Sequence, residues 1–157
     1  MENTEISIEA NPDDLTKDKI KELSENFNRI SIGVQSFFDE DLELMNRSHD
    51  SSQAKNSIEL TKKYFDNISI DLIYGIPGLT DYKWRKNIKT AKNYNLPHIS
   101  AYALTVEPNT ILSKLIEKGK IDNINDETLM RQNEIIVIEL EKCKYLNYEL
   151  SSFALKN

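Results

Sequence analysis

Four short segments of this 157-residue chain repeat one pattern, in which apolar residues alternate with small or polar ones. They lie at residues 5–9 (EISIE), 29–35 (RISIGVQ), 68–74 (ISIDLIY) and 99–103 (ISAYA). An alternation with a period of two, rich in β-branched residues, predicts a β-strand in each segment. The spacing of these four strands along the chain limits the folds that the sequence can adopt.

Helical segments separate and follow the predicted strands. Start signals precede three stretches of helical periodicity, at Thr16, Ser51 and Thr80. A shorter helix is expected after Asp39, and two more are expected within residues 108–120 and 125–144. Residues 145–153 are expected to form a final strand or extended segment. Strands that alternate with helices in this way are typical of βαβ units in a parallel sheet.

The chain length limits how many such units can form. A complete barrel of eight βα units takes about 250 residues, so a chain of 157 residues has room for four or five units. The chain is long enough to bury the core of one domain. Because 39% of its residues are hydrophobic and 29% are charged, the composition is typical of a globular protein and not of a disordered one.

The two faces of the predicted strands differ in polarity. One face is apolar throughout, whereas the other is mostly small or polar and carries Ser7, Glu9, Ser31, Gly33, Gln35, Ser69, Asp71, Ile73, Ser100, Tyr102 and Leu104. Strands of a doubly wound sheet are covered on both faces and are apolar on both. The sequence therefore favours a barrel or half-barrel whose polar face binds a polar ligand. The alternative is a polar face in contact with water, but right-handed crossovers place successive helices on one side, as in a barrel.

Charge and cysteine content exclude several kinds of site. With 26 acidic and 20 basic residues, the net charge of −6 disfavours a nucleic-acid partner. The sequence contains no run of ~18 apolar residues and no basic N-terminal region, so no transmembrane segment and a cytoplasmic location are expected. One cysteine, Cys143, excludes an intramolecular disulfide and a metal site built only from cysteines of this chain.

Polar residues near the carboxyl ends of the strands are the candidate site residues. Glu9, Gln35 and Asp71 are expected to converge there, because parallel α/β folds bind ligands at that edge. Asp71 stands in an apolar run and must meet a hydrogen-bond donor or a cation, which a structural pair would also supply. Arg47 could clamp a carboxylate. The alternatives are a solvated carboxylate at Glu9, a loop-capping amide at Gln35 and a solvated guanidinium at Arg47.

Other motifs carry weaker signals. The glycines of the turn at residues 74–78 (YGIPG) would let backbone amides approach a ligand. The turn is only a weak candidate for a phosphate loop, because its glycines are not followed by lysine and then serine or threonine. His49 and His98 are expected to be surface or loop residues and not metal ligands. The aromatic residues expected to serve in packing are Phe37, Trp84, Tyr94 and Tyr102. The residues alone thus predict a polar-lined part of a parallel barrel that binds a small, partly charged ligand.

Four stretches in this order, IEANPDDLT, RISIGVQSFFDEDLELMNRSH, NISIDLIYGIPG and HISAYALTVEPNT, resemble the radical S-adenosylmethionine proteins of the oxygen-independent coproporphyrinogen III oxidase and haem chaperone (HemN/HemW) family. The resemblance extends over essentially the whole chain. It implies a six-stranded partial (β/α) barrel, of which residues 1–157 would form the central and C-terminal part of the core, strands three to six with the following helices, and no second domain.

The resemblance also implies cofactors and site residues. S-adenosyl-L-methionine would bind to Glu9 through its methionine portion, with polar contacts to both portions from Gln35, Arg47 and Asp71. The stretches VEPNT and YELSSFA are more similar to the haem chaperone branch, which implies binding of haem and its delivery to an acceptor protein. The alternatives are oxidative decarboxylation of a porphyrinogen, a non-catalytic haem- or nucleotide-binding module, and an inert remnant.

One departure from the family is large. The CxxxCxxC loop that holds the [4Fe–4S] cluster and a glycine-rich motif precede the IEANP stretch in the family, and neither occurs in these 157 residues. Cys143 lies in a predicted helix near the other end. The chain alone is therefore expected to carry out no radical chemistry, and to be either a fragment of a longer protein or a degenerate product that only binds.

Overall fold

A single six-stranded sheet forms the centre of the molecule, in the order β1-β2-β3-β4-β6-β5. The computed structural model describes residues 4–156. The strands are β1 (Ser7–Ala10), β2 (Arg29–Gln35), β3 (Ile68–Tyr74), β4 (His98–Ala103), β5 (Tyr145–Glu149) and β6 (Ser152–Leu155). The first four are parallel neighbours, and β6 runs antiparallel to both β4 and β5. The predicted α/β fold with about four parallel βα units is confirmed.

Among residues 4–156, six α-helices and one short 3-10 helix connect and follow the strands. They are η1 (Pro12–Asp14), α1 (Lys17–Ser24), α2 (Asp39–Leu44), α3 (Ser51–Thr61), α4 (Asp81–Asn93), α5 (Ile111–Glu117) and α6 (Asp126–Glu141). The hydroxyls of Thr16 and Thr80 accept hydrogen bonds from backbone amides in the first turns of α1 and α4, as their start signals predict. Helix α3 begins at Ser51, but the capping side chain is that of Asp50.

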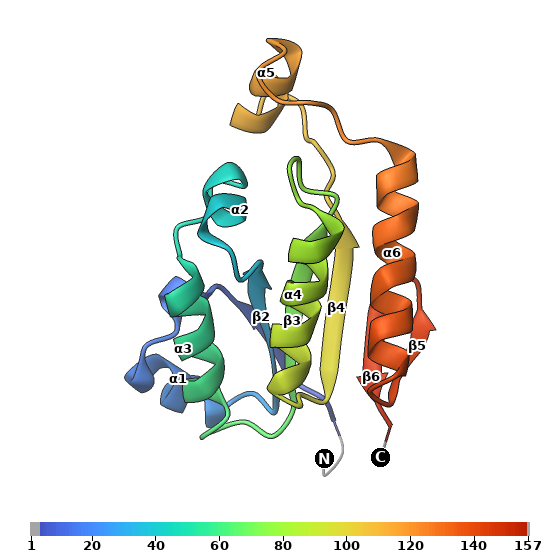
Figure 1. Cartoon of the computed structure of the whole chain (residues 1–157). Helices are drawn as coiled ribbons and strands as arrows, with labels where there is room; N and C mark the ends of the chain where they lie inside the picture. Colours follow the sequence, from blue (N-terminus) through green and yellow to red (C-terminus); the bar gives the residue numbers. More distant parts are fainter. Residues whose placement is uncertain (1–3, 157) are drawn as a thin grey trace.

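Four of the helices, α1, α3, α4 and α6, cover one face of the sheet (Figure 1). Their apolar side chains pack against the isoleucines of the strands, and Ile32, Ile70 and Ile99 are fully buried there. Burial of each such side chain stabilises the fold by about 1.5–3 kcal/mol. Helices α2 and α5 lie beyond the carboxyl ends of the parallel strands (Figure 1). All the covering helices are thus on one side, as right-handed crossovers in a barrel require.

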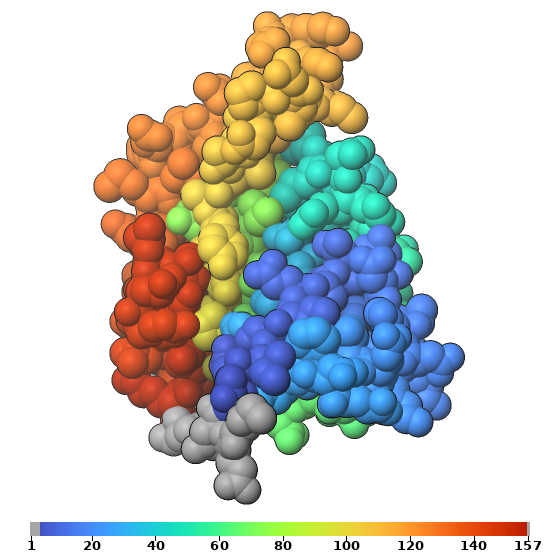
Figure 2. All heavy atoms as spheres, turned by 180° about the vertical axis from the view of Figure 1, so that it is seen from behind, coloured from blue at the N-terminus to red at the C-terminus, as the bar shows by residue number. Residues whose placement is uncertain are grey.

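The opposite face of the sheet is the polar one. Seen from behind, β4 lies at the surface between the N-terminal segment and the C-terminal hairpin (Figure 2). The exposed Tyr102 lies on this face, so its expected role in packing is wrong, whereas Trp84 and Phe37 are buried in the core. A sheet with one helical face and one open, polar face agrees with a partial barrel.

The C-terminal segment differs from its prediction. Residues 145–153 were expected to form one extended segment, but β5 and β6 form an antiparallel hairpin that turns at Leu150 and Ser151. The hairpin forms because β6 pairs with the edge of β4, which buries Phe153 beside Ile99. At the other edge, Ile6 precedes β1 and is half exposed, so the first strand is shorter than its sequence pattern suggests. No helix among residues 4–156 is both long and apolar enough to span a membrane.

Candidate functional site

Asp71 lies at the centre of the polar face, held between two serines. The register of the sheet pairs Glu9 with Ser31 and Asp71 with Ser100, so these side chains point to the same side. The Ser31 hydroxyl donates to the Asp71 carboxylate at 3.2 Å from Oδ1 and 3.3 Å from Oδ2. Four strands, β1 to β4, thereby contribute to one polar cluster.

Burial dominates the electrostatics of this cluster. Desolvation raises the pKa of Asp71 above its usual 3.8, although hydrogen bonds from Ser31 and Ser100 oppose the shift. The negative charge of Glu9 raises the pKa further. Within residues 4–156 Asp71 forms no ion pair. The positive charge of Arg29 opposes the shift, but too weakly to cancel it. A partly buried carboxylate without an ion-pair partner is a strong acceptor for the hydroxyl or amino group of a ligand.

A second cluster surrounds Gly33, the next residue on this face of β2. A Cβ atom added at Gly33 would lie 2.9 Å from Nε2 of Gln35, 3.4 Å from Oδ1 of Asn11 and 3.7 Å from Nη2 of Arg47. Three polar side chains from three segments therefore surround the space that the missing side chain leaves. We call this arrangement the Gly33 cradle. It presents an amide, a carbonyl oxygen and a cation side by side, which suits a ligand with both a donor and a carboxylate.

Gln35 reaches the cradle from an unusual backbone conformation. Its φ is +65°, and the amide of Ser36 donates to the carbonyl oxygen of Val34 at 2.8 Å. This is a γ-turn of the rare type with a positive central φ. The pairing of β2 with β3 also shifts register between Ile32 and Gln35. A bulge therefore ends the strand and redirects the glutamine.

Arg47 reaches the cradle because of the way in which helix α2 ends. Asn46 adopts a left-handed conformation with φ of +54°, and its amide donates to the carbonyl of Glu43. The amide of Arg47 then donates to the carbonyl of Leu42. This pair of hydrogen bonds is the Schellman cap of a helix C-terminus, for which asparagine is well suited. The cap turns the chain so that the Arg47 guanidinium lies over β2. Arg47 forms no ion pair within residues 4–156.

A groove of about 540 Å³ continues from Arg47 along the carboxyl edge of the sheet. It is lined by residues 44–47, Ile73, 104–107 and 109–112. We call it the carboxyl-edge groove. Its walls carry several apolar side chains, among them Ile73, Leu104 and Val106, and its volume is in the range of small-molecule sites. It lies where parallel α/β folds bind their ligands.

The four candidate residues lie on the same side of the sheet but in two clusters. Glu9 and Asp71 belong to the serine-lined cluster, whereas Gln35 and Arg47 belong to the Gly33 cradle. The sequence interpretation did not single out Asn11 or Gly33 as site residues. A signal for Gly33 was present, since it is the only glycine within the four predicted strands and its neighbours on that face are polar.

The histidines and the YGIPG turn differ in part from their expected roles. His49 lies in the loop between α2 and α3, as expected, but it is buried, with Nε2 3.1 Å from the carbonyl oxygen of Val34. His98 is the first residue of β4 and not a loop residue. The Gly75 amide donates to Oε1 of Gln132 on α6 at 2.8 Å. That amide is therefore occupied by the protein itself, and the turn is a structural anchor.

The residues present do not fit an iron–sulfur cluster. No group of three His, Cys, Asp or Glu side chains that could hold a metal ion occurs among residues 4–156. Cys143 is half-buried beside the C-terminus of α6, away from both clusters.

Comparisons with known proteins place these features in a family context. The family described as the Radical SAM superfamily matches residues 1–91. The heme chaperone HemW of Bacillus subtilis is 39% identical over 96% of this chain, and that of Lactococcus lactis is 36% identical over 96%. The chain spans about 40% of the length of these curated relatives.

Solved structures share the fold. The coproporphyrinogen III oxidase HemN of Escherichia coli, described as a radical SAM enzyme, superposes with a TM-score of 0.83 and 26% identity over 96% of this chain and 35% of its own. The Elp3 protein of Methanocaldococcus infernus superposes with a TM-score of 0.68 over 74% of this chain and 28% of its own, at 24% identity. The similarity to HemN covers nearly the whole chain, including the hairpin edge of the sheet.

Proposed function

Since the chain belongs to the radical SAM superfamily, we propose that it is the S-adenosyl-L-methionine-binding part of a haem-chaperone-like radical SAM protein, comprising strands three to six of its partial barrel. The Gly33 cradle carries this proposal. It brings the Gln35 amide and the Arg47 cation together over Gly33 on the polar face, next to the Asp71 cluster. A zwitterionic amino acid joined to a nucleoside needs such a mixture of donors, acceptors and charges.

The side chains suit the parts of S-adenosyl-L-methionine. The Arg47 guanidinium matches a carboxylate, and the Glu9 carboxylate matches the amino group of the methionine portion. Gln35 and Asp71 supply further polar contacts to the methionine and adenosine portions. Asp71 is suited to accept from hydroxyl groups, because it is partly buried and has no cation partner among the described residues.

We propose no radical step for this chain alone. Radical SAM proteins use a [4Fe–4S] cluster, and the residues of this chain do not fit one. What the chain's own residues can do is bind and orient the methionine derivative. Any radical chemistry would need cluster ligands that residues 4–156 do not supply.

Haem is the proposed second ligand. The relatives named heme chaperones favour this ligand. In its full-length form, the protein would bind haem and deliver it to an acceptor protein. The apolar walls of the carboxyl-edge groove support an apolar ligand beside Arg47. The similarity to HemN favours a second candidate function, oxidative decarboxylation of a porphyrinogen in the full-length form.

A cytoplasmic location belongs to the same proposal, and the composition of the chain favours it.

Titration of the purified chain with S-adenosyl-L-methionine tests the proposal. Saturable binding is expected, and Arg47→Ala should weaken it about tenfold or more, because a charge-assisted pair contributes about 1.5–3 kcal/mol. Arg85→Ala is the matched control, since Arg85 pairs with Glu139 on the helical face of the sheet. Absence of saturable binding, or equal effects of the two variants, would overturn the proposal. A parallel titration with haem tests the second ligand, and no saturable binding would remove haem from it.

A further inference from the structure

The γ-turn at Gln35 is costly to form. Five non-glycine residues have a positive φ in the part of the chain that the structure describes. Gln35 is the last residue of a strand, whereas the other four lie outside the strands: Asn46, Asn95, Asn109 and Lys144. Asparagine tolerates this region because its short side chain can hydrogen-bond locally, but glutamine has no such advantage. A strained residue of this kind persists only where the surrounding structure imposes its conformation.

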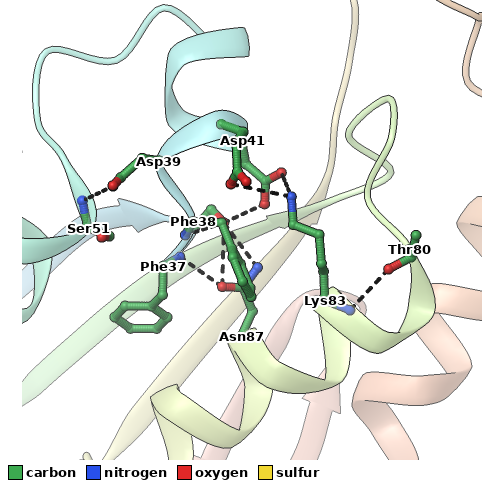
Figure 3. Close-up of polar contacts among 10 residues, drawn as sticks. Phe37, Phe38, Asp39, Asp41, Ser51, Thr80, Lys83 and Asn87 are labelled. Carbon is green, nitrogen blue, oxygen red and sulfur yellow. Dashed lines mark hydrogen bonds and ion pairs between the residues drawn. The ribbon is translucent and has the colours of Figure 1, made fainter.

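Buried hydrogen bonds impose that conformation from the other side of the strand end (Figure 3). The Phe37 amide donates to Oδ1 of Asn87 at 2.8 Å, and Nδ2 of Asn87 donates to the Ser36 hydroxyl at 3.0 Å. Asn87, on helix α4, is fully buried, and so is Ser36. The two residues that directly follow Gln35 are therefore both held by one amide side chain, which is 50 positions from Phe37 in sequence.

The network continues to the surface through an ion pair (Figure 3). The Ser36 hydroxyl donates to Oδ2 of Asp41 at 2.7 Å, and the Lys83 ammonium donates to Oδ1 of Asp41 at 2.8 Å. Asp41 is 3% exposed, so Lys83 supplies the cation that its buried carboxylate requires. Each of these polar groups has a partner, and a fully satisfied buried network is rigid.

This network does not touch the candidate ligand site. Asn87, Asp41 and Lys83 line neither the Gly33 cradle nor the carboxyl-edge groove. The Gln35 amide, by contrast, lies over Gly33. The most direct route from Asn87 to a ligand in the cradle therefore runs through the backbone of residues 35–37.

We propose that Asn87 is a positioning residue, which holds Gln35 in its left-handed turn through Ser36 and Phe37 and thereby sets the affinity for S-adenosyl-L-methionine. This inference rests on the proposed function, because it takes the ligand of the cradle from there. Asn87 acts only through Gln35. Its effect on binding must accordingly disappear when the Gln35 side chain is removed.

A double-mutant cycle on the purified chain tests this dependence. Gln35→Ala and Asn87→Ala should each weaken binding of S-adenosyl-L-methionine by about tenfold, and the double variant should be no weaker than Gln35→Ala alone. Gln132→Ala is the matched control. Gln132 is also a fully buried amide that holds a loop, but its partners are Gly75 and Leu79. It should lower stability without weakening binding. Additive effects of Gln35→Ala and Asn87→Ala would overturn the proposal.

A readout without ligand separates this inference from the proposed function. Hydrogen exchange of the Phe37 amide should accelerate at least about tenfold in Asn87→Ala and stay unchanged in Gln132→Ala. If the parent chain binds no S-adenosyl-L-methionine, the proposed function fails, and faster exchange still supports the turn-holding role of Asn87. Unchanged exchange in a folded Asn87→Ala chain would overturn the inference whatever the ligand result.

A second variant covers the case in which Asn87→Ala does not fold. Ser36→Ala removes the hydroxyl that links Asn87 to the turn and leaves the Lys83–Asp41 ion pair in place. It should accelerate exchange of the Phe37 amide and weaken binding in the same direction, by a smaller factor. A folded Ser36→Ala chain with unchanged exchange and unchanged binding would overturn the proposal, because Ser36 is one of the two residues through which Asn87 acts.

Discussion

The hydroxyl of Ser31 on β2 donates a hydrogen bond to the carboxylate of Asp71 on β3, 3.2 Å away on the open face of the sheet. This bond does not fully replace the water that the carboxylate loses, since the pKa of Asp71 is raised from 3.8 mainly by desolvation. Between the unfolded and the folded pKa, the folded chain binds more protons than the unfolded chain. The contribution of Asp71 to stability therefore falls as the pH rises through this window, and the penalty remains at neutral pH.

Replacement of this carboxylate should stabilise the chain at neutral pH. Asp71→Asn removes the charge that burial penalises, so urea unfolding at about pH 7 should show a higher free energy of unfolding than for the parent chain. At about pH 3, where the carboxyl is mostly protonated in both states, the difference should shrink. Asp66→Asn on the exposed surface is the control and should change stability little at either pH. An Asp71→Asn chain that is less stable at both pH values would contradict this prediction.

A methyl group at Gly33 should weaken binding while leaving the fold intact. Gly33→Ala adds a Cβ 2.9 Å from Nε2 of Gln35, which can move away because it is the end of a flexible side chain. The change therefore costs little stability but occupies the cradle. Binding of S-adenosyl-L-methionine should fall by about tenfold or more. Gly78→Ala is the control: Gly78 has a φ of +81° and open space around it, so alanine there should lower stability and spare binding.

The strain at Gln35 should appear as a preference for glycine. Glycine adopts a positive φ freely, so Gln35→Gly should be more stable than Gln35→Ala by about 1 kcal/mol in urea unfolding. At Glu59, an exposed position in α3, the alanine variant should instead be more stable than the glycine variant by about 1 kcal/mol, because glycine weakens a helix. If alanine were the more stable residue at both positions, the backbone at Gln35 would not be strained.

Protonation of His98 should weaken the fold. Its Nδ1 lies 2.8 Å from the Ser69 hydroxyl and its Nε2 lies 2.8 Å from the Tyr148 hydroxyl, so it links β3, β4 and β5. Burial lowers the pKa of His98 below 6.5, with help from Arg29, whereas Glu149 and Glu5 oppose the shift. Because the pKa of His98 is lower in the folded chain than in the unfolded chain, the neutral histidine contributes its full stabilisation above pH 6.5. This contribution is lost as the pH falls toward the pKa of the folded chain.

Unfolding measured across this pH range tests the role of His98. The parent chain should lose stability as the pH falls below about 6.5, and His98→Gln should remove the part of this loss that comes from the histidine. His98→Gln should be the less stable chain at pH 7, because it loses the paired hydrogen bonds. A variant whose stability falls with pH just as the parent's does would exclude His98 as the titrating group.

Local patterns predicted the elements of the fold well. The alternation in residues 29–35 and 68–74 marks the bounds of β2 and β3 as they occur, and Thr16 and Thr80 cap helices where the sequence places them. The separation of apolar and polar faces followed from the same period of two. These features depend on residues within a few positions of each other, so the sequence contains the information directly.

The arrangement of the candidate site was only partly predictable. The pattern of polar residues near the strand ends predicts that Glu9, Gln35 and Asp71 lie on one face of the sheet. It does not predict that they divide into two separate clusters. The convergence of Asn11, Gln35 and Arg47 at Gly33 was not expected, because it depends on side chains from different segments of the chain.

By itself, the amino-acid sequence determined the alternating strands and helices, the one polar face of the sheet and the lack of cysteines for a cluster. Only the tertiary structure decided that residues 145–155 form a hairpin on the edge of β4 and that Asn87 holds the turn at Gln35. The physical reason is the separation in sequence over which each kind of interaction acts. Periodicity and helix capping act over a few residues, whereas the partner of a buried amide or a free strand edge is chosen by packing between segments far apart in the chain.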